Sequence, residues 1–120
     1  MALRCLIVDD SEAFLASASR LLEGQGLEIV GCASTGQEAL RLSDALRPDV
    51  ALVDVQLGDE DGFELTRQLT GDGRPIAVVL ISTHSRDDLE DLIAFSPAVG
   101  FLSKTALSAA AIAALVGSES

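Results

Sequence analysis

The stretch DVALVDV, residues 49–55, decides how the rest of the chain is interpreted. Its apolar side chains follow one another without the polar alternation of a strand that has one face in water. Such a run is typical of a strand covered on both faces, as in a parallel sheet. Asp54 breaks the run, and a lone carboxylate in an apolar strand is costly unless it has a partner. The stretch therefore predicts a buried strand that carries an acidic group to the edge of a sheet.

Apolar runs and helical patterns alternate on both sides of this strand. Because short loops separate them, the alternation predicts an α/β fold, with a parallel, doubly wound sheet, helices on both faces and right-handed crossovers. We expect five βα units in one domain, residues 1–120, with no linker or repeat inside it. The other strands are expected at 3–8, 27–33, 76–82 and 98–103, and the helices at 11–24, 35–47, 61–70, 85–95 and 105–117. Thr35 with Glu38, and Ser85 with Asp88, have the spacing of a capping box at the start of a helix. One inward face of the first helix is expected to hold its apolar residues, Phe14, Leu15, Ala18, Leu21 and Leu22.

Composition narrows the function classes. The 19 acidic and 8 basic residues give a net charge of −11, which disfavours direct contact with a nucleic-acid backbone. No apolar run is long enough to cross a bilayer, and the acidic pair 9–10 interrupts any secretory pattern, so we expect a cytoplasmic protein with no membrane contact. Cys5 and Cys32 are expected to be free, buried thiols, because two cysteines make neither a disulfide framework nor a metal cluster.

The predicted strands end on groups that carry chemistry. In parallel α/β sheets, ligands bind outside the carboxyl ends of the strands. Three carboxylates crowded there repel one another, and a hard divalent cation such as Mg²⁺ together with a lysine would relieve the repulsion. An aspartate in that setting is equipped to accept a phosphoryl group. The groups at the expected strand ends are Asp9, Asp10, Asp54, Ser82, Thr83, Ser103 and Lys104.

Four motifs that contain these groups resemble the receiver domain of two-component response regulators. They are DD (9–10), VDVQLGDEDGFEL (53–65), LIST (80–83) and GFLSK (100–104), and they occur in order over nearly the whole chain. The resemblance implies a flavodoxin-like (βα)5 sandwich with strand order 2-1-3-4-5. It also implies a phosphorylation-controlled switch, not a conventional enzyme. The phosphoryl group would come from the phosphohistidine of a sensor histidine kinase or a phosphotransfer protein.

The resemblance assigns the reacting groups by position. Asp54 matches the aspartate that accepts the phosphoryl group. Asp9 and Asp10 match the acidic pair that holds Mg²⁺, together with Asp54 and the backbone carbonyl of Gln56. Lys104 matches the lysine that pairs with the phosphate.

The resemblance also assigns the residues that would respond to phosphorylation. Ser82 matches the hydroxyl that binds a phosphoryl oxygen after transfer, and Phe101 falls at the switch aromatic. Gln56 and His84 flank the phosphoryl group and are expected to tune its hydrolysis. We expect the surface formed by the fourth helix, the fifth strand and the fifth helix to bind a partner or a second copy of the chain. At three places the sequence departs from the family, since Leu57-Gly58 replaces Met-Pro, Thr83 replaces a small Ala or Gly, and Thr105 replaces Pro.

Simpler interpretations remain open for several of these residues. The pair 9–10 also fits a solvated turn or a helix cap, Ser82 a bond to its own backbone, Phe101 the plain core, and His84 an exposed loop. The acidic segment GDEDG (58–62) fits a solvated turn at a helix start better than a calcium loop.

Two other functions are also consistent with an α/β chain of this kind. The first is a receiver-like binding module that never takes phosphate. The second is an aspartate-nucleophile phosphohydrolase, which would need a spaced D-x-D at the first strand and an inserted cap. The adjacent pair 9–10 and the short chain disfavour the phosphohydrolase.

Overall fold

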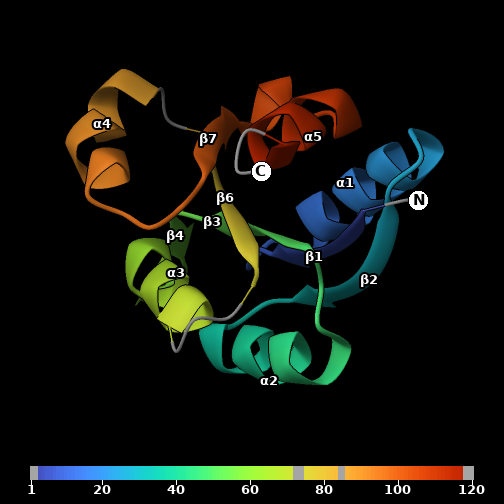
Figure 1. Ribbon diagram of the computed structural model, residues 1–120, viewed down its shortest axis with the longest axis horizontal. Helices are drawn as coiled ribbons and strands as arrows, with labels where there is room; N and C mark the ends of the chain where they lie inside the picture. The colour runs from blue at the N-terminus through green and yellow to red at the C-terminus, as the bar shows by residue number, and fades with distance from the viewer. Residues whose placement is uncertain (1–2, 72–74, 84–85, 118–120) are drawn as a thin grey trace.

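The computed structural model describes residues 3–71, 75–83 and 86–117 and shows a five-stranded parallel sheet between two layers of helices (Figure 1). The sheet order is β2-β1-β3-β6-β7. The third strand is buried throughout, as DVALVDV predicts. The order is the expected 2-1-3-4-5, because β6 and β7 are the fourth and fifth strands of this sheet. The strands are β1 (Arg4–Val8), β2 (Glu28–Ala33), β3 (Val50–Asp54), β6 (Ala77–Ser82) and β7 (Gly100–Ser103).

The helices lie on both faces of the sheet, which confirms the doubly wound prediction (Figure 1). Side chains that alternate along each strand feed two separate apolar clusters. On β1, Cys5 and Ile7 pack toward α1 and α5, whereas Leu6 and Val8 pack toward α2, α3 and α4. The helices are α1 (Glu12–Gly24), α2 (Gly36–Leu46), α3 (Gly62–Thr70), α4 (Arg86–Ala94) and α5 (Ala109–Gly117).

The helix starts follow from local capping. Ser11 caps α1, since its hydroxyl oxygen accepts a hydrogen bond from the N–H of Phe14 at 3.2 Å. The acidic pair 9–10 is therefore not the cap of this helix, and that interpretation was wrong. Thr35 caps α2 in the same way through the N–H of Glu38, as its spacing predicts. The cap expected at Ser85 lies outside the described residues.

The acidic segment after β3 is more ordered than a solvated turn. Its flanks pair as a small antiparallel hairpin of β4 (Gln56–Leu57) and β5 (Glu60–Asp61), with Gly58 at a φ of 57° in the turn. Leu57 is buried in the apolar cluster below α3, and this burial holds the hairpin against the domain. Asp61 accepts a hydrogen bond from the N–H of Phe63 at 2.9 Å, so the predicted helix start is confirmed.

The last helix begins later than predicted. A 3-10 turn, η2 (Lys104–Ala106), follows β7, and α5 starts at Ala109. Ser108 explains the later start, because its hydroxyl accepts a hydrogen bond from the N–H of Ala111 at 3.0 Å. The peptide bond between Lys104 and Thr105 is trans.

Two burial predictions were wrong. Cys32 is exposed, because β2 is one of the two edge strands of the five-stranded sheet, whereas Cys5 is buried on β1. Burial raises the pKa of the Cys5 thiol to about 12, with a smaller contribution from Cys32, so Cys5 stays a protonated thiol.

Leu21, which the helical pattern places on the inner face of α1, is 45% exposed. The buried stripe of α1 is Leu15, Ala18 and Leu22.

Gly62 stands where the chain turns from the hairpin into α3. A β-carbon at this position would lie 2.1 Å from the backbone oxygen of Asp54 and 2.7 Å from the α-carbon of Val55. No flexible side chain can move aside, since both obstacles are backbone atoms. The glycine therefore fixes how closely α3 packs against the end of β3.

We predict that Gly62→Ala destabilises the fold by roughly 1–3 kcal/mol, because the backbone must move to admit the methyl group. Gly71→Ala is the matched control, since a β-carbon there meets nothing within 4 Å. Its free energy of unfolding should stay within about 0.5 kcal/mol of the wild type. Urea denaturation monitored by circular dichroism measures both variants. Equal stability of the two variants would contradict the close approach at Gly62.

Candidate functional site

Strand register brings the acidic residues to one edge of the sheet. β1 and β3 pair in parallel up to Val8 and Val53, so Asp9 and Asp54 follow at the same level. The carboxyl ends of parallel strands meet at one edge, and both side chains therefore emerge there. β6 continues one residue beyond its pairing with Asp54 and ends at Ser82.

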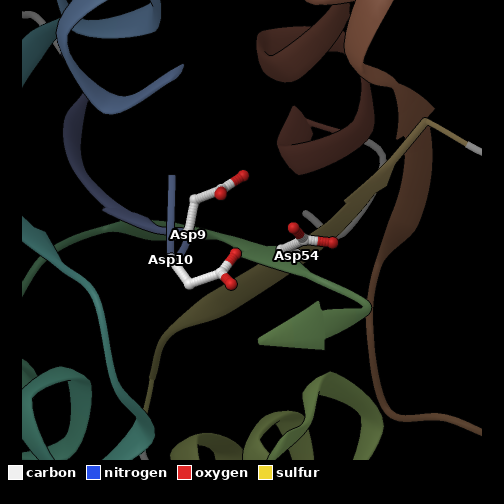
Figure 2. Close-up of side chains that lie close together, drawn as sticks. All are labelled: Asp9, Asp10 and Asp54. Atoms are coloured by element: carbon white, nitrogen blue, oxygen red, sulfur yellow. The ribbon is translucent and has the colours of Figure 1, made fainter. Parts of the chain in front are cut away.

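Asp9, Asp10 and Asp54 form one carboxylate cluster. One oxygen from each lies within 4.8 Å of the others, and Figure 2 shows the three side chains gathered at the ends of β1 and β3. Their environments differ, because Asp9 is fully buried, Asp54 is nearly so, and Asp10 is exposed. The cluster thus opens to solvent on the side of Asp10.

Lys104 places one positive charge against this cluster. Its Nζ lies 2.5 Å from Oδ2 of Asp9 and 3.1 Å from Oδ2 of Asp54, and its side chain is 15% exposed. Burial alone would lower the pKa of Lys104, but its contacts with the two carboxylates outweigh burial and raise it. Lys104 is therefore a charged ammonium shared between two strands.

Among the described residues, one ammonium faces the three carboxylates, and one positive charge does not balance them. Burial raises the pKa of Asp54, and the charge of Asp9 adds to the rise, against the opposing effects of Lys104 and of the N–H of Gln56. That N–H donates to Oδ1 of Asp54 at 3.1 Å. The protein leaves the ionised form of Asp54 less stable than it is in water. A further cation would offset the difference.

The oxygen atoms present fit a divalent metal ion. Oδ1 of Asp9 accepts a hydrogen bond from the N–H of Ser11 at 2.8 Å. Oδ2 of Asp9 is buried and, among the described residues, accepts no hydrogen bond of good geometry beside its ion pair with Lys104. A buried carboxylate oxygen with spare capacity, next to two further carboxylates, is the donor set that a hard cation such as Mg²⁺ prefers.

A hollow of about 220 Å³ opens beside the cluster. Its walls come from three strand ends and from the β4–β5 hairpin, so a small anionic group could reach the Asp54 carboxylate through it. The residues that line it are Asp10, Asp54, Val55, Gln56, Gly58, Ser82 and Thr83.

The remaining predicted site residues fall in three places. Ser82 is buried at the end of β6 and lines the hollow with the exposed Gln56. Phe101 is buried in the apolar cluster under α4, where Ile93 belongs to the same cluster. His84 lies outside the described residues.

Two contacts of the site were missed by sequence reasoning. The ring of Phe14 lies 4.3 Å from Nζ of Lys104, measured to the ring centroid. The carboxylate of Glu60 accepts the N–H of Gly36 at 3.1 and 3.2 Å and so ties the hairpin to the start of α2. In the sequence, Phe14 is one of several apolar residues on a helix face, and Glu60 is one of several acidic residues in a turn. Neither pattern predicts the contact of Phe14 with Lys104 or of Glu60 with Gly36.

Comparison with known proteins decides the family. The family model described as the response regulator receiver domain matches residues 5–116. The chain belongs to this family. Receiver domains are signalling domains of two-component systems and typically bind Mg²⁺, which agrees with the acidic cluster at the strand ends. The described residues contain no helix long and apolar enough to cross a membrane.

Curated relatives of this receiver are longer proteins. The response regulator GacA of Pseudomonas aeruginosa is 32% identical over 105 residues, which is 87% of this chain and 49% of GacA. The response regulator UvrY of Escherichia coli K12 is 31% identical over 102 residues, 84% of this chain and 47% of UvrY. The chain thus spans about half the length of these relatives.

Solved receiver structures share the fold. The signal receiver domain of the putative response regulator NarL from Mycobacterium tuberculosis superimposes with a TM-score of 0.84 at 30% identity, and covers 97% of this chain and 98% of that one. A response regulator from Burkholderia pseudomallei, described with a phosphorylated aspartic acid, a calcium ion and citrate, gives a TM-score of 0.81 at 26% identity. That match covers 94% of this chain and 66% of the other.

We predict that Asp10→Ala lowers the affinity for Mg²⁺ by at least about tenfold, because even indirect partners of a metal site are worth about that much. The fold should survive, since Asp10 is exposed. Asp59→Ala is the matched control, an exposed acid of the hairpin turn outside the carboxylate cluster. Isothermal titration calorimetry with MgCl₂ measures both. Unchanged Mg²⁺ affinity in Asp10→Ala would leave the pair 9–10 without a metal role.

Proposed function

We propose that Asp54 accepts a phosphoryl group from the phosphohistidine of a sensor histidine kinase or a phosphotransfer protein. The domain then acts as a cytoplasmic, phosphorylation-controlled switch, and not as an enzyme that turns over separate substrates. The observation that supports this most directly is the placement of the Asp54 carboxylate. It lies beside an open hollow, in the carboxylate cluster, with Lys104 at 3.1 Å.

The reaction is a transfer between two nucleophiles. A carboxylate oxygen of Asp54 forms a bond to phosphorus as the bond from phosphorus to the histidine nitrogen breaks. The nitrogen keeps the electron pair, and the ring leaves as neutral imidazole when its other nitrogen already carries a proton in the phosphohistidine. Lys104 is already in contact with Asp54, so its ammonium is in place for the negative charge on the phosphoryl oxygens. Ser82 borders the hollow, where its hydroxyl would bind another of these oxygens.

Mg²⁺ would be held by the carboxylates of Asp9, Asp10 and Asp54 and the backbone carbonyl of Gln56. When bound, it neutralises charge shared by the aspartate and the phosphoryl group. The raised pKa of Asp54 and the unfilled acceptor capacity of Asp9 support this assignment. The Burkholderia pseudomallei response regulator, which is described with a phosphorylated aspartic acid and a calcium ion, supports an aspartyl phosphate and a divalent cation on this fold.

Phosphorylation of Asp54 would change the balance of charge between Lys104 and the carboxylates that it contacts. A phosphate on Asp54 adds about −1.5 to −2 charge, which draws Lys104 and Ser82 toward it. Phe101 lies on β7 under α4, so its ring is placed to follow this movement and shift the population of two surface arrangements. Gln56 and His84 would tune how long the aspartyl phosphate survives attack by water.

The switch output is proposed at the surface of α4, β7 and α5. Next to this surface, on the side of α4 toward α3, Leu92 is 54% exposed and Phe95, just after the helix, is 86% exposed. Both side chains line a hollow with the β4–β5 hairpin and with Phe63 of α3. Exposed apolar groups of this size favour an interaction surface. We propose that a second copy of the chain packs there after phosphorylation. The net charge of −11 argues against direct contact of this domain with nucleic acid.

We predict that incubation with acetyl phosphate and Mg²⁺ adds the mass of one phosphoryl group to the wild type and none to Asp54→Asn, because the amide cannot form the acyl phosphate. Intact-mass spectrometry measures the adduct. An equal adduct in both proteins would refute Asp54 as the acceptor. Absence of any adduct, repeated with a phosphorylated histidine phosphotransfer protein as donor, would favour a binding module that never takes phosphate.

We also predict that phosphorylation shifts the chain toward a dimer and that Leu92→Ser weakens this dimer about tenfold, as loss of an apolar anchor does at many interfaces. Leu21→Ser is the matched control, because Leu21 is a similarly exposed leucine on α1, on the other face of the sheet. Sedimentation velocity with and without acetyl phosphate measures both variants. A dimer through α4 would be refuted if the sedimentation coefficient did not change on phosphorylation, or if Leu21→Ser weakened the dimer as much as Leu92→Ser.

A further inference from the structure

The ammonium of Lys104 touches three groups from three different elements. Asp9 follows β1, Asp54 ends β3, and the third group is the ring of Phe14 from the first turn of α1. The Nζ atom lies 4.3 Å from the centroid of that ring, well within the range of a cation–π contact. Because the side chain of Lys104 is only 15% exposed, water weakens this contact less than it would at an open surface.

Phe14 is held in register with the carboxylate cluster by hydrogen bonds at the start of α1. The N–H of Phe14 donates to the hydroxyl of Ser11 at 3.2 Å, and the N–H of Ser11 donates to Oδ1 of Asp9 at 2.8 Å. The ring also packs against the apolar cluster that α1 and α5 share. The position of the ring is therefore fixed relative to Asp9, not merely close to it.

The ring differs from the two carboxylates in what else it can bind. A divalent cation takes oxygen ligands, so occupation of the carboxylate cluster would weaken the contacts of Lys104 with Asp9 and Asp54. Phe14 has no lone pair for the metal, and its face still attracts the ammonium. It also leaves the N–H donors of Lys104 free for oxygen atoms, because a phenyl ring is no conventional hydrogen-bond acceptor.

We propose that Phe14 is a positioning residue for Lys104. Its ring holds the ammonium beside Asp54 when the carboxylates are engaged elsewhere, and so speeds phosphoryl acceptance. This inference rests on the proposed function of Asp54 and adds to it a residue of α1 that acts only through Lys104.

The test compares Phe14→Leu, which keeps an apolar side chain but removes the ring, with Phe14→Tyr, which keeps the ring. At saturating Mg²⁺ and acetyl phosphate, Phe14→Leu should form the aspartyl phosphate about threefold to tenfold more slowly than the wild type. Phe14→Tyr should stay within about twofold. The Mg²⁺ dissociation constant should change by less than about twofold in both, since the ring is not a ligand.

A readout independent of activity is the ring-current shift of the Lys104 ε-methylene protons, measured by NMR in the Mg²⁺-bound protein. The upfield shift expected below an aromatic face should persist in Phe14→Tyr and vanish in Phe14→Leu. Leu15→Val controls for general loosening of α1, because Leu15 is a buried core residue of that helix. This control should lower the melting temperature but alter neither the rate nor the ring-current shift.

A double-mutant cycle separates positioning from packing. In a Lys104→Met background, Phe14→Leu should not slow phosphorylation further, because the cation that the ring holds is gone. The same slowing in both backgrounds, or a wild-type rate in Phe14→Leu, would overturn the role of Phe14 while Asp54 remains the acceptor. If the wild type takes no phosphate from either donor, the proposed function itself fails, and this inference fails with it.

Discussion

The ammonium of Lys104, shared between Asp9 and Asp54, is the interaction on which the site depends. It joins the end of β1, the end of β3 and the segment after β7, so three parts of the chain that are distant in sequence meet at one charge. In the part of the chain that the structure describes, the charges do not balance, because one cation faces a cluster of three carboxylates and burial raises the pKa of Asp54. A site in this condition gains stability from a divalent metal ion and responds to any new charge placed on Asp54.

The packing of the sheet keeps the excess negative charge of the carboxylate cluster at one edge. Two apolar clusters cover its faces, so the central strands cannot relax to admit water along their length. The carboxylate cluster lies at the carboxyl edge, and there the hairpin of β4 and β5 leads into α3 through Gly62, where a β-carbon would meet the backbone of Asp54 at the end of β3. The unbalanced carboxylates therefore lie at the end of the molecule where Asp10 is exposed to solvent.

Several features could be predicted from the residues alone because they depend on short-range patterns. The run 49–55 predicted a strand buried on both faces, the alternation of strands and helices predicted the doubly wound architecture, and the spacing of Thr35 and Glu38 predicted a cap. Features that depend on which strand lies at an edge of the sheet were not predictable, and Cys32 is exposed because β2 is an edge strand. The late start of α5 was missed although its signal is local, because the hydroxyl of Ser108 accepts a hydrogen bond from the N–H of Ala111.

The sequence by itself determined the residue types at the strand ends and, through hydrophobic periodicity, that those ends share one edge. The family assignment of the four motifs rests on the same information. Only the tertiary structure decided how the charges are paired. Whether Lys104 meets Asp9 as well as Asp54, and whether an aromatic ring from α1 lies against that ammonium, depends on how α1 packs across the sheet. That packing is set by long-range contacts, and no local pattern around Phe14 encodes it.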